Sequence, residues 1–160
     1  MNVRDKKIQS LILGGHGDSM VAMVNHTKVD GKNLIEFVKE GKIKKEKLEA
    51  IIDRTKKGGA EIVKYLEKGS AFYAPAASGV EMAESYLKDL KKELPCAVYL
   101  NGEYGVKNIY AGVPVIIGAK GVEKVIELKL SEEEKKNFNN SIKAVKELFT
   151  AAGKIDKELV

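Results

Sequence analysis

With 160 residues, 44% of them hydrophobic, the chain is long enough to bury the core of one domain and short for two. The formal charge of +5 comes from acidic and basic residues interspersed along helical stretches, and aromatic residues make up only 6%, which excludes a typical nucleic-acid surface. No apolar run approaches the about 20 residues that span a bilayer, so we expect a soluble, cytoplasmic protein without a membrane partner.

Cys96 is the single cysteine of the chain. One cysteine excludes an internal disulfide. Because the chain also has only two histidines, we expect no metal site. A free cysteine behaves as a small hydrophobe, so we interpret Cys96 as a thiol of the core. Methionine side chains are flexible and apolar, so we interpret Met20 and Met23 as residues that fill the core.

The N-terminal half favours two strands followed by helices. The apolar residues of Ile8 to Leu13 and of Met20 to Val24 predict strands joined by a glycine-rich turn. Asn33 is placed to cap a short helix. Helical spacing of apolar residues then continues from Lys44 to Leu66, with a break predicted at Gly58-Gly59.

The middle of the chain changes from helix to strands. A helix is predicted from about Tyr73 to Leu90, with Pro75 in the first turn, where a proline costs no internal hydrogen bond. From Cys96 onward, β-branched and alternating apolar residues predict an antiparallel meander. Its expected strands are Ala97 to Leu100, Ile109 to Ile117 and Val122 to Leu130.

Ser131 and Glu134 form a capping box that opens the last helix. The apolar face predicted to dock this helix consists of Phe138, Ile142, Val145, Leu148 and Phe149. Because strands segregate from helices instead of alternating with them, residues 1–160 predict one α+β domain, an antiparallel sheet packed with helices. No Gly-x-Gly-x-x-Gly loop and no phosphate-cradling lysine loop is present.

His16 is the candidate for acid–base chemistry, in the segment GGHGDSM at 14–20. Its glycine neighbours leave the imidazole accessible, and histidine can both give and take a proton at a hydroxyl or carbonyl oxygen near neutral pH. A packed or surface imidazole is the alternative on residue type alone. His26 lacks this glycine setting, and we expect it in a strand or turn.

Two further motifs follow GGHGDSM: GSAFYAPAA at 69–77, and LPCA at 94–97 with GEYG at 102–105. In this order the three motifs resemble the lactate/malate dehydrogenase family, and within it the lactate dehydrogenase-like malate dehydrogenases of bacteria. The likeness runs from about Val3 to the C-terminus. It implies the fold of that family's C-terminal, substrate-side domain and the NAD-dependent, reversible oxidation of (S)-malate to oxaloacetate, a step of the tricarboxylic acid cycle.

The resemblance also assigns roles to residues. It makes His16 the proton donor and acceptor, places Ser70 and Ala71 at the border of the substrate pocket, and brings Pro75 toward the nicotinamide ring of NAD. For Ser70, Ala71 and Pro75 the alternative is that they only begin a helix, with Ser70 as its cap and Pro75 in its first turn.

The resemblance further implies that the aspartate partner of the histidine and the substrate-binding arginines precede this chain. The arginines present, Arg4 and Arg54, match no substrate arginine and are expected at the surface, and Asp18 is expected to shape its turn. We therefore expect NAD to be bound mainly by an N-terminal half that is absent from this chain, and the chain alone to be inactive.

The expected partners are malate or oxaloacetate, the NAD-binding half, and further copies in a dimer or tetramer. Without that half, the surface bearing His16, Ser70 and Pro75 is expected to be partly uncovered, with apolar patches beside it. Two alternatives stay open: a fragment of an L-lactate dehydrogenase, and a non-catalytic module that serves association. A hydrolase that uses His16 would need a serine or cysteine nucleophile in a motif, and none is present.

Overall fold

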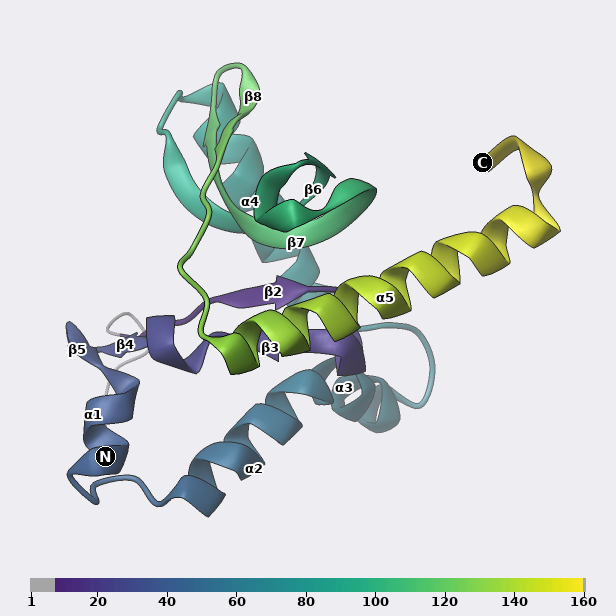
Figure 1. Cartoon of the computed structure of the whole chain (residues 1–160). Coiled ribbons are helices and arrows are strands. Elements are labelled where there is room, and N and C mark those ends of the chain that lie inside the picture. The colour runs from purple at the N-terminus through teal and green to yellow at the C-terminus, as the bar shows by residue number, and fades with distance from the viewer. Residues whose placement is uncertain (1–7, 160) are drawn as a thin grey trace. The chain divides into compact units, whose positions relative to one another are not determined.

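The computed structural model describes residues 8–159 (Figure 1). These residues fall into two compact units. Within the described residues, the first unit comprises 8–12 and 22–80, and the second comprises 13–21 and 81–159. Antiparallel strands and helices make up the chain, which confirms the predicted α+β class. Arg4, expected at the surface, lies outside the described residues.

The first unit combines short strands with helices, whose bounds are β1 (Ile8–Gln9), β4 (Lys28–Val29), β5 (Lys32–Asn33), α1 (Leu34–Lys39), α2 (Lys45–Lys56) and α3 (Gly58–Leu66). The strands pair antiparallel in the order β1-β4-β5. Asn33 caps α1 as predicted, because its side-chain oxygen accepts a hydrogen bond of 2.9 Å from the Ile35 backbone N–H. Helices α2 and α3 meet at Lys57, which confirms the predicted break next to Gly58-Gly59.

Helix α4 (Tyr73–Leu87) confirms the helix predicted there, with Pro75 in its first turn. It ends at Leu87 and not at the predicted Leu90. The reason is local, since Asp89 adopts a φ of 50°, a left-handed conformation that ends a right-handed helix.

The second unit is organised around one central strand, β7. The sheet order is β3-β2-β7-β6, and β8 also pairs with β7. The bounds are β2 (Ile12–Gly14), β3 (Met20–Ala22), β6 (Lys92–Asn101), β7 (Lys107–Gly118) and β8 (Gly121–Val125). The β6–β7 and β7–β8 pairs are antiparallel, which confirms the predicted meander. Strand β6 begins earlier than predicted, at Lys92, and β8 ends earlier, at Val125.

Burial follows the strand period. The inward residues of β7 form much of the core, namely Ile109, Ala111, Val113, Val115 and Ile117. On β6, residues at even positions are half-buried or buried and their neighbours are exposed, as a strand with one covered face requires.

Cys96 is half-buried on β6, and its Sγ lies 3.4 Å from Sδ of Met82. The interpretation of Cys96 as a thiol of the core is therefore wrong: Cys96 lies on the covered face of β6, but on that face only Leu100 is fully buried. Partial burial raises the pKa of the Cys96 thiol, which makes it a poor nucleophile. Of the two methionines expected in the core, Met23 is fully buried and Met20 is half-buried.

Helix α5 (Glu132–Ile155) begins with the predicted capping box. Ser131 Oγ accepts a hydrogen bond from the Glu134 backbone N–H, and a Glu134 carboxylate oxygen accepts one from the Ser131 N–H. Phe138 and Ile142 are buried, but Leu148 is 71% exposed, so only the first half of the predicted docking face is covered. Within the second unit, the last turns of α5 extend away from β6, β7 and β8 (Figure 1).

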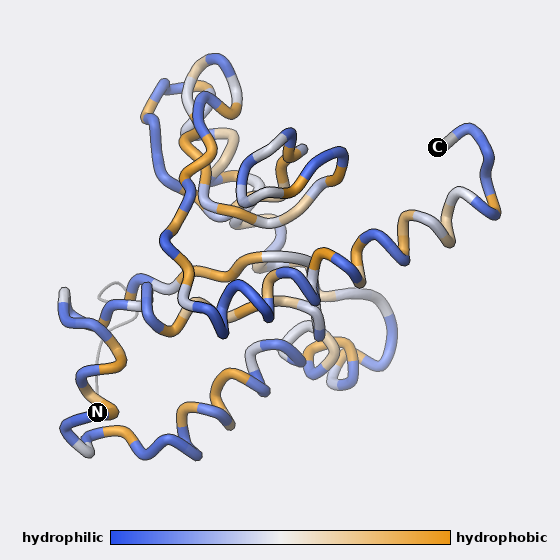
Figure 2. Tube along the Cα trace, viewed as in Figure 1, coloured by the Kyte–Doolittle hydropathy of each residue, from blue (hydrophilic) through white to orange (hydrophobic). Residues whose placement is uncertain are grey.

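Apolar residues recur between hydrophilic ones along the whole of α5 (Figure 2). The stripe therefore continues beyond the part that is covered. Within residues 8–159, no helix combines the length and the apolar character needed to cross a membrane.

Candidate functional site

His16 lies immediately after β2, between that strand and the short 3-10 turn Gly17–Ser19. Its side chain is exposed and its backbone is extended, with φ −92° and ψ 151°. Gly14, at the end of β2, pairs with Gly112 of the central strand β7. The imidazole is thus carried on a turn that starts from the sheet of the second unit.

Hydrogen bonds hold the backbone on both sides of this imidazole. The Gly15 N–H donates to Oγ of Ser141 on α5 at 2.8 Å, and Ser141 itself is 3% exposed. The Ser19 hydroxyl donates to the His16 carbonyl oxygen at 3.3 Å. The residue expected to perform the chemistry is therefore exposed, but its backbone is fixed.

The glycines before His16 are explained by packing against α5. A Cβ on Gly14 would lie 2.2 Å from Ser141 Oγ, and a Cβ on Gly15 would lie 2.9 Å from Cγ2 of Val145. Neither position has room for a side chain. The sequence interpretation, that the glycines keep the imidazole accessible, fits only Gly17, where a Cβ would meet nothing within 4 Å.

The other residues with predicted roles lie as follows. Ser70 is exposed and Ala71 half-buried in the segment before α4, and Pro75 is exposed in the first turn of that helix. They belong to the first unit, whereas His16 belongs to the second. Asp18 lies in the turn after His16, as expected of a turn-forming residue.

His26 lies in a turn and Arg54 at the surface, as the sequence predicted. His26 ends the 3-10 turn Val24–His26. Arg54 is exposed on α2 and forms a bidentate ion pair with Glu61 of α3, at 2.8 and 3.0 Å. The hydrogen bonds from Arg54 lower the pKa of the Glu61 carboxyl.

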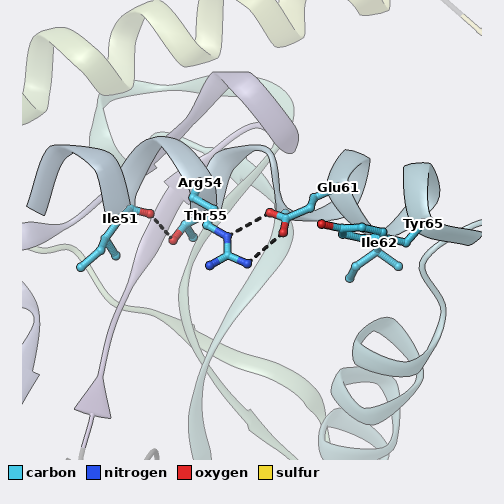
Figure 3. Close-up of a pocket in the computed structure, with 7 residues that line it drawn as sticks. Ile51, Arg54, Thr55, Glu61, Ile62 and Tyr65 are labelled. Carbon is cyan, nitrogen blue, oxygen red and sulfur yellow. Dashed lines mark hydrogen bonds and ion pairs between the residues drawn. The ribbon is translucent and has the colours of Figure 1, made fainter. Parts of the chain in front are cut away.

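An open groove of about 470 Å³ lies around this ion pair (Figure 3). Besides the pair it is lined by Ile51, Thr55, Gly58, Ile62 and Tyr65. No residue with a predicted catalytic, substrate or cofactor role lines it. Among residues 8–159 there is also no group of three or more histidine, cysteine, aspartate or glutamate side chains that could hold a metal ion.

Tyr104 gives the motif GEYG at 102–105 a structural role that the sequence did not reveal. Its hydroxyl donates to the Ile126 carbonyl oxygen at 2.7 Å and accepts from the Leu128 N–H at 3.0 Å, and its ring lies 5.2 Å from that of Phe138 on α5. Tyr104 therefore fastens the segment that connects β8 to α5, and with it the helix that carries Ser141.

We expect Tyr104→Phe to lower the free energy of unfolding by about 1–3 kcal/mol, because two half-buried backbone groups lose their partner. Tyr99→Phe is the matched control, since the Tyr99 hydroxyl contacts only the exposed Asn108 side chain at 3.2 Å. We expect it to cost less than about 0.5 kcal/mol. Urea unfolding followed by circular dichroism measures both, and equal losses would contradict the role of Tyr104.

The same pair of variants also predicts a pH dependence. Burial raises the pKa of Tyr104 above its ordinary value of 10. The unfolded chain then ionises first, so this contribution to stability is complete below pH 10 and is lost as the pH rises through the higher pKa of the folded state. The alkaline loss should be smaller in Tyr104→Phe than in Tyr99→Phe.

Comparison with known proteins identifies the family of the chain. The family described as lactate/malate dehydrogenase, alpha/beta C-terminal domain, matches residues 1–154. The malate dehydrogenase of Pelagibacter ubique is 66% identical over 99% of this chain and 50% of its own length, and that of Caulobacter vibrioides is 54% identical over 96% and 48%.

Solved structures give the same result. The chain is similar to a lactate dehydrogenase of Eimeria maxima with NADH and oxamate, with a TM-score of 0.92 and 44% identity over 97% of this chain and 48% of that one. It is also similar to malate dehydrogenase of Cryptosporidium parvum, with a TM-score of 0.88 and 44% identity over 91% and 46%. The chain spans about half the length of these relatives and aligns with their C-terminal half. It belongs to the lactate/malate dehydrogenase family, whose C-terminal domain it represents.

Proposed function

We propose that this chain is the substrate-side half of an NAD-dependent malate dehydrogenase that interconverts (S)-malate and oxaloacetate, as in the tricarboxylic acid cycle of the cytoplasm. The observation that carries the proposal is the placement of His16: an exposed imidazole on a turn whose backbone is held on both sides. The high identity to malate dehydrogenases supports the choice of substrate.

His16 would act as the general base in the oxidation direction. Its imidazole accepts the hydroxyl proton of malate while the C2 hydrogen departs as a hydride, and the O–H and C–H bond pairs become the carbonyl bond and the hydride. In the reverse direction the imidazolium returns the proton to the oxaloacetate oxygen. An exposed ring on a fixed backbone suits this task, because it reaches substrate without a large change of geometry.

The residues of this chain could form only a small part of the binding site for NAD. Pro75 is exposed at the start of α4 and can offer an apolar surface to the nicotinamide ring, while Ser70 and Ala71 can border the substrate. NAD supplies the hydride acceptor when it is bound. The chain has no glycine-rich phosphate loop, so we propose that the preceding half of the longer protein binds most of the cofactor.

That preceding half would also supply the arginines for the substrate carboxylates and the aspartate that orients His16. Without it we propose that the chain is inactive. Large apolar side chains are exposed on several helices, among them Tyr73, Leu87, Leu148 and Ile155. Exposed apolar side chains in each unit are consistent with association with that half and with further copies in a dimer or tetramer.

A fusion protein tests the proposal: the N-terminal half of the Pelagibacter ubique relative joined to this chain. We expect malate-dependent reduction of NAD that neither half shows alone. The absorbance of the NADH formed measures this reaction. Binding of NADH, measured by its fluorescence, serves as the folding control for the N-terminal half. A fusion that binds NADH but oxidises neither malate nor lactate would leave the non-catalytic module as the better function.

Lactate is the second candidate substrate, because the similar solved structures include lactate dehydrogenases. A higher kcat/KM for lactate than for malate in the fusion protein would favour it. Both substrates need the same proton transfer at His16, so this comparison separates the substrates and leaves the mechanism unchanged.

A further inference from the structure

We propose that Ser141 is the positioning residue of His16: from α5 it holds the Gly14–Gly15 peptide group, one residue ahead of the histidine, and so sets where the imidazole stands. The proposal rests on the function proposed for His16. Ser141 is far from His16 in sequence but is joined to the neighbouring residue by the 2.8 Å hydrogen bond from Gly15.

Ser141 lies on the apolar stripe of α5, where a polar side chain is unexpected. It is one turn from Phe138, next to Ile142 and one turn before Val145, and it is buried like the first two of these. Burying a hydroxyl is costly unless it forms hydrogen bonds. The partner that Ser141 has is the backbone N–H one residue before the catalytic candidate.

The contact is tight enough to fix a position. The backbone at Gly14 and Gly15 lies so close to Ser141 and Val145 that neither position has room for a side chain. The hydrogen bond sets the direction of the Gly14–Gly15 peptide group, and the absence of side chains on both glycines lets this peptide lie close against α5. The position of His16 is thereby tied to α5 in the second unit.

The helix is itself anchored at this point. Phe138, 1% exposed, packs beside the ring of Tyr104, whose hydroxyl holds the chain that leads into α5. A continuous set of contacts therefore runs from Tyr104 through Phe138 and Ser141 to the turn that carries His16. Each contact lies within the second unit.

The first test uses the 160-residue chain itself and amide hydrogen exchange by NMR. In the unmodified chain the Gly15 amide should be protected more strongly than the amides of the turn Gly17–Ser19; a Gly15 amide that exchanges as fast as the amides of that turn would overturn the proposal without any variant. In Ser141→Ala we expect exchange at Gly15 to rise about tenfold and the His16 ring-proton resonances to shift.

Ser85→Ala is the matched control. Ser85 is fully buried in the same unit, and its hydroxyl donates to the Ile117 carbonyl oxygen at 2.7 Å and accepts from the Lys92 N–H at 3.2 Å. This variant should lose stability as Ser141→Ala does, but leave Gly15 exchange and the His16 resonances unchanged. Equal effects of both variants on Gly15 and His16 would show that Ser141 is merely structural.

The fusion protein gives the functional readout. Because a misplaced base weakens only the transition state, Ser141→Ala should lower kcat and kcat/KM together by about tenfold, while KM changes little. Ser85→Ala should retain both constants. A fusion without malate or lactate activity would refute the function proposed for His16, whereas the NMR comparison would still decide whether Ser141 positions it.

Discussion

Replacing His16 by asparagine in the fusion protein should lower kcat/KM for malate by about 10²- to 10⁴-fold. Asparagine keeps a polar, uncharged side chain but cannot accept the hydroxyl proton. The turn should keep its shape, because its hydrogen bonds involve the backbone of residues 15 and 16 and not the imidazole. NADH absorbance measures the rate, and NADH fluorescence shows that the cofactor still binds.

His26→Asn is the matched control for this experiment. His26 lies half-buried at the end of a 3-10 turn in the first unit and matches no catalytic motif. We expect this variant to retain the rate within about a factor of three, as a substitution away from the chemistry usually does. Loss of activity in both variants would point to folding, and retained activity in His16→Asn would refute the mechanism.

The elements with strong local signals were predictable from the sequence. Asn33 as a cap, the break beside Gly58-Gly59 and the capping box at Ser131 are all fixed by residues within one helical turn of each other. The antiparallel class also followed, because strands and helices are segregated along the chain. Local chemistry decides these features, and the sequence shows it directly.

Features that depend on distant partners were not predictable in this way. The end of α4 is set by the left-handed conformation of Asp89, and the half-buried state of Cys96 depends on how completely its face of β6 is covered. The placement of His16 after a strand could be predicted, but its support could not, since Gly15 and Ser141 are 126 residues apart. One signal was visible: Ser141 interrupts the apolar stripe of α5.

Exchanging Gly14 for alanine should destabilise the chain by about 3–5 kcal/mol, a large part of the 5–15 kcal/mol that usually holds a domain together. Gly14 has a φ of +90°, which alanine adopts only with strain of about 1–3 kcal/mol. In addition, the new Cβ would lie 2.2 Å from Oγ and 2.8 Å from Cβ of Ser141, so helix α5 or strand β2 must move.

Gly121→Ala separates the two costs within the same unit. Gly121 has a similar φ of +85° in the β7–β8 turn, but a Cβ there would meet nothing within 4 Å. This variant should lose only the strain, about 1–3 kcal/mol. The difference between the two losses, measured by urea unfolding, is then the cost of forcing α5 away from the turn that carries His16. Equal losses would mean that α5 yields without resistance, and the close packing of Ser141 on Gly14 would then have no part in holding that turn.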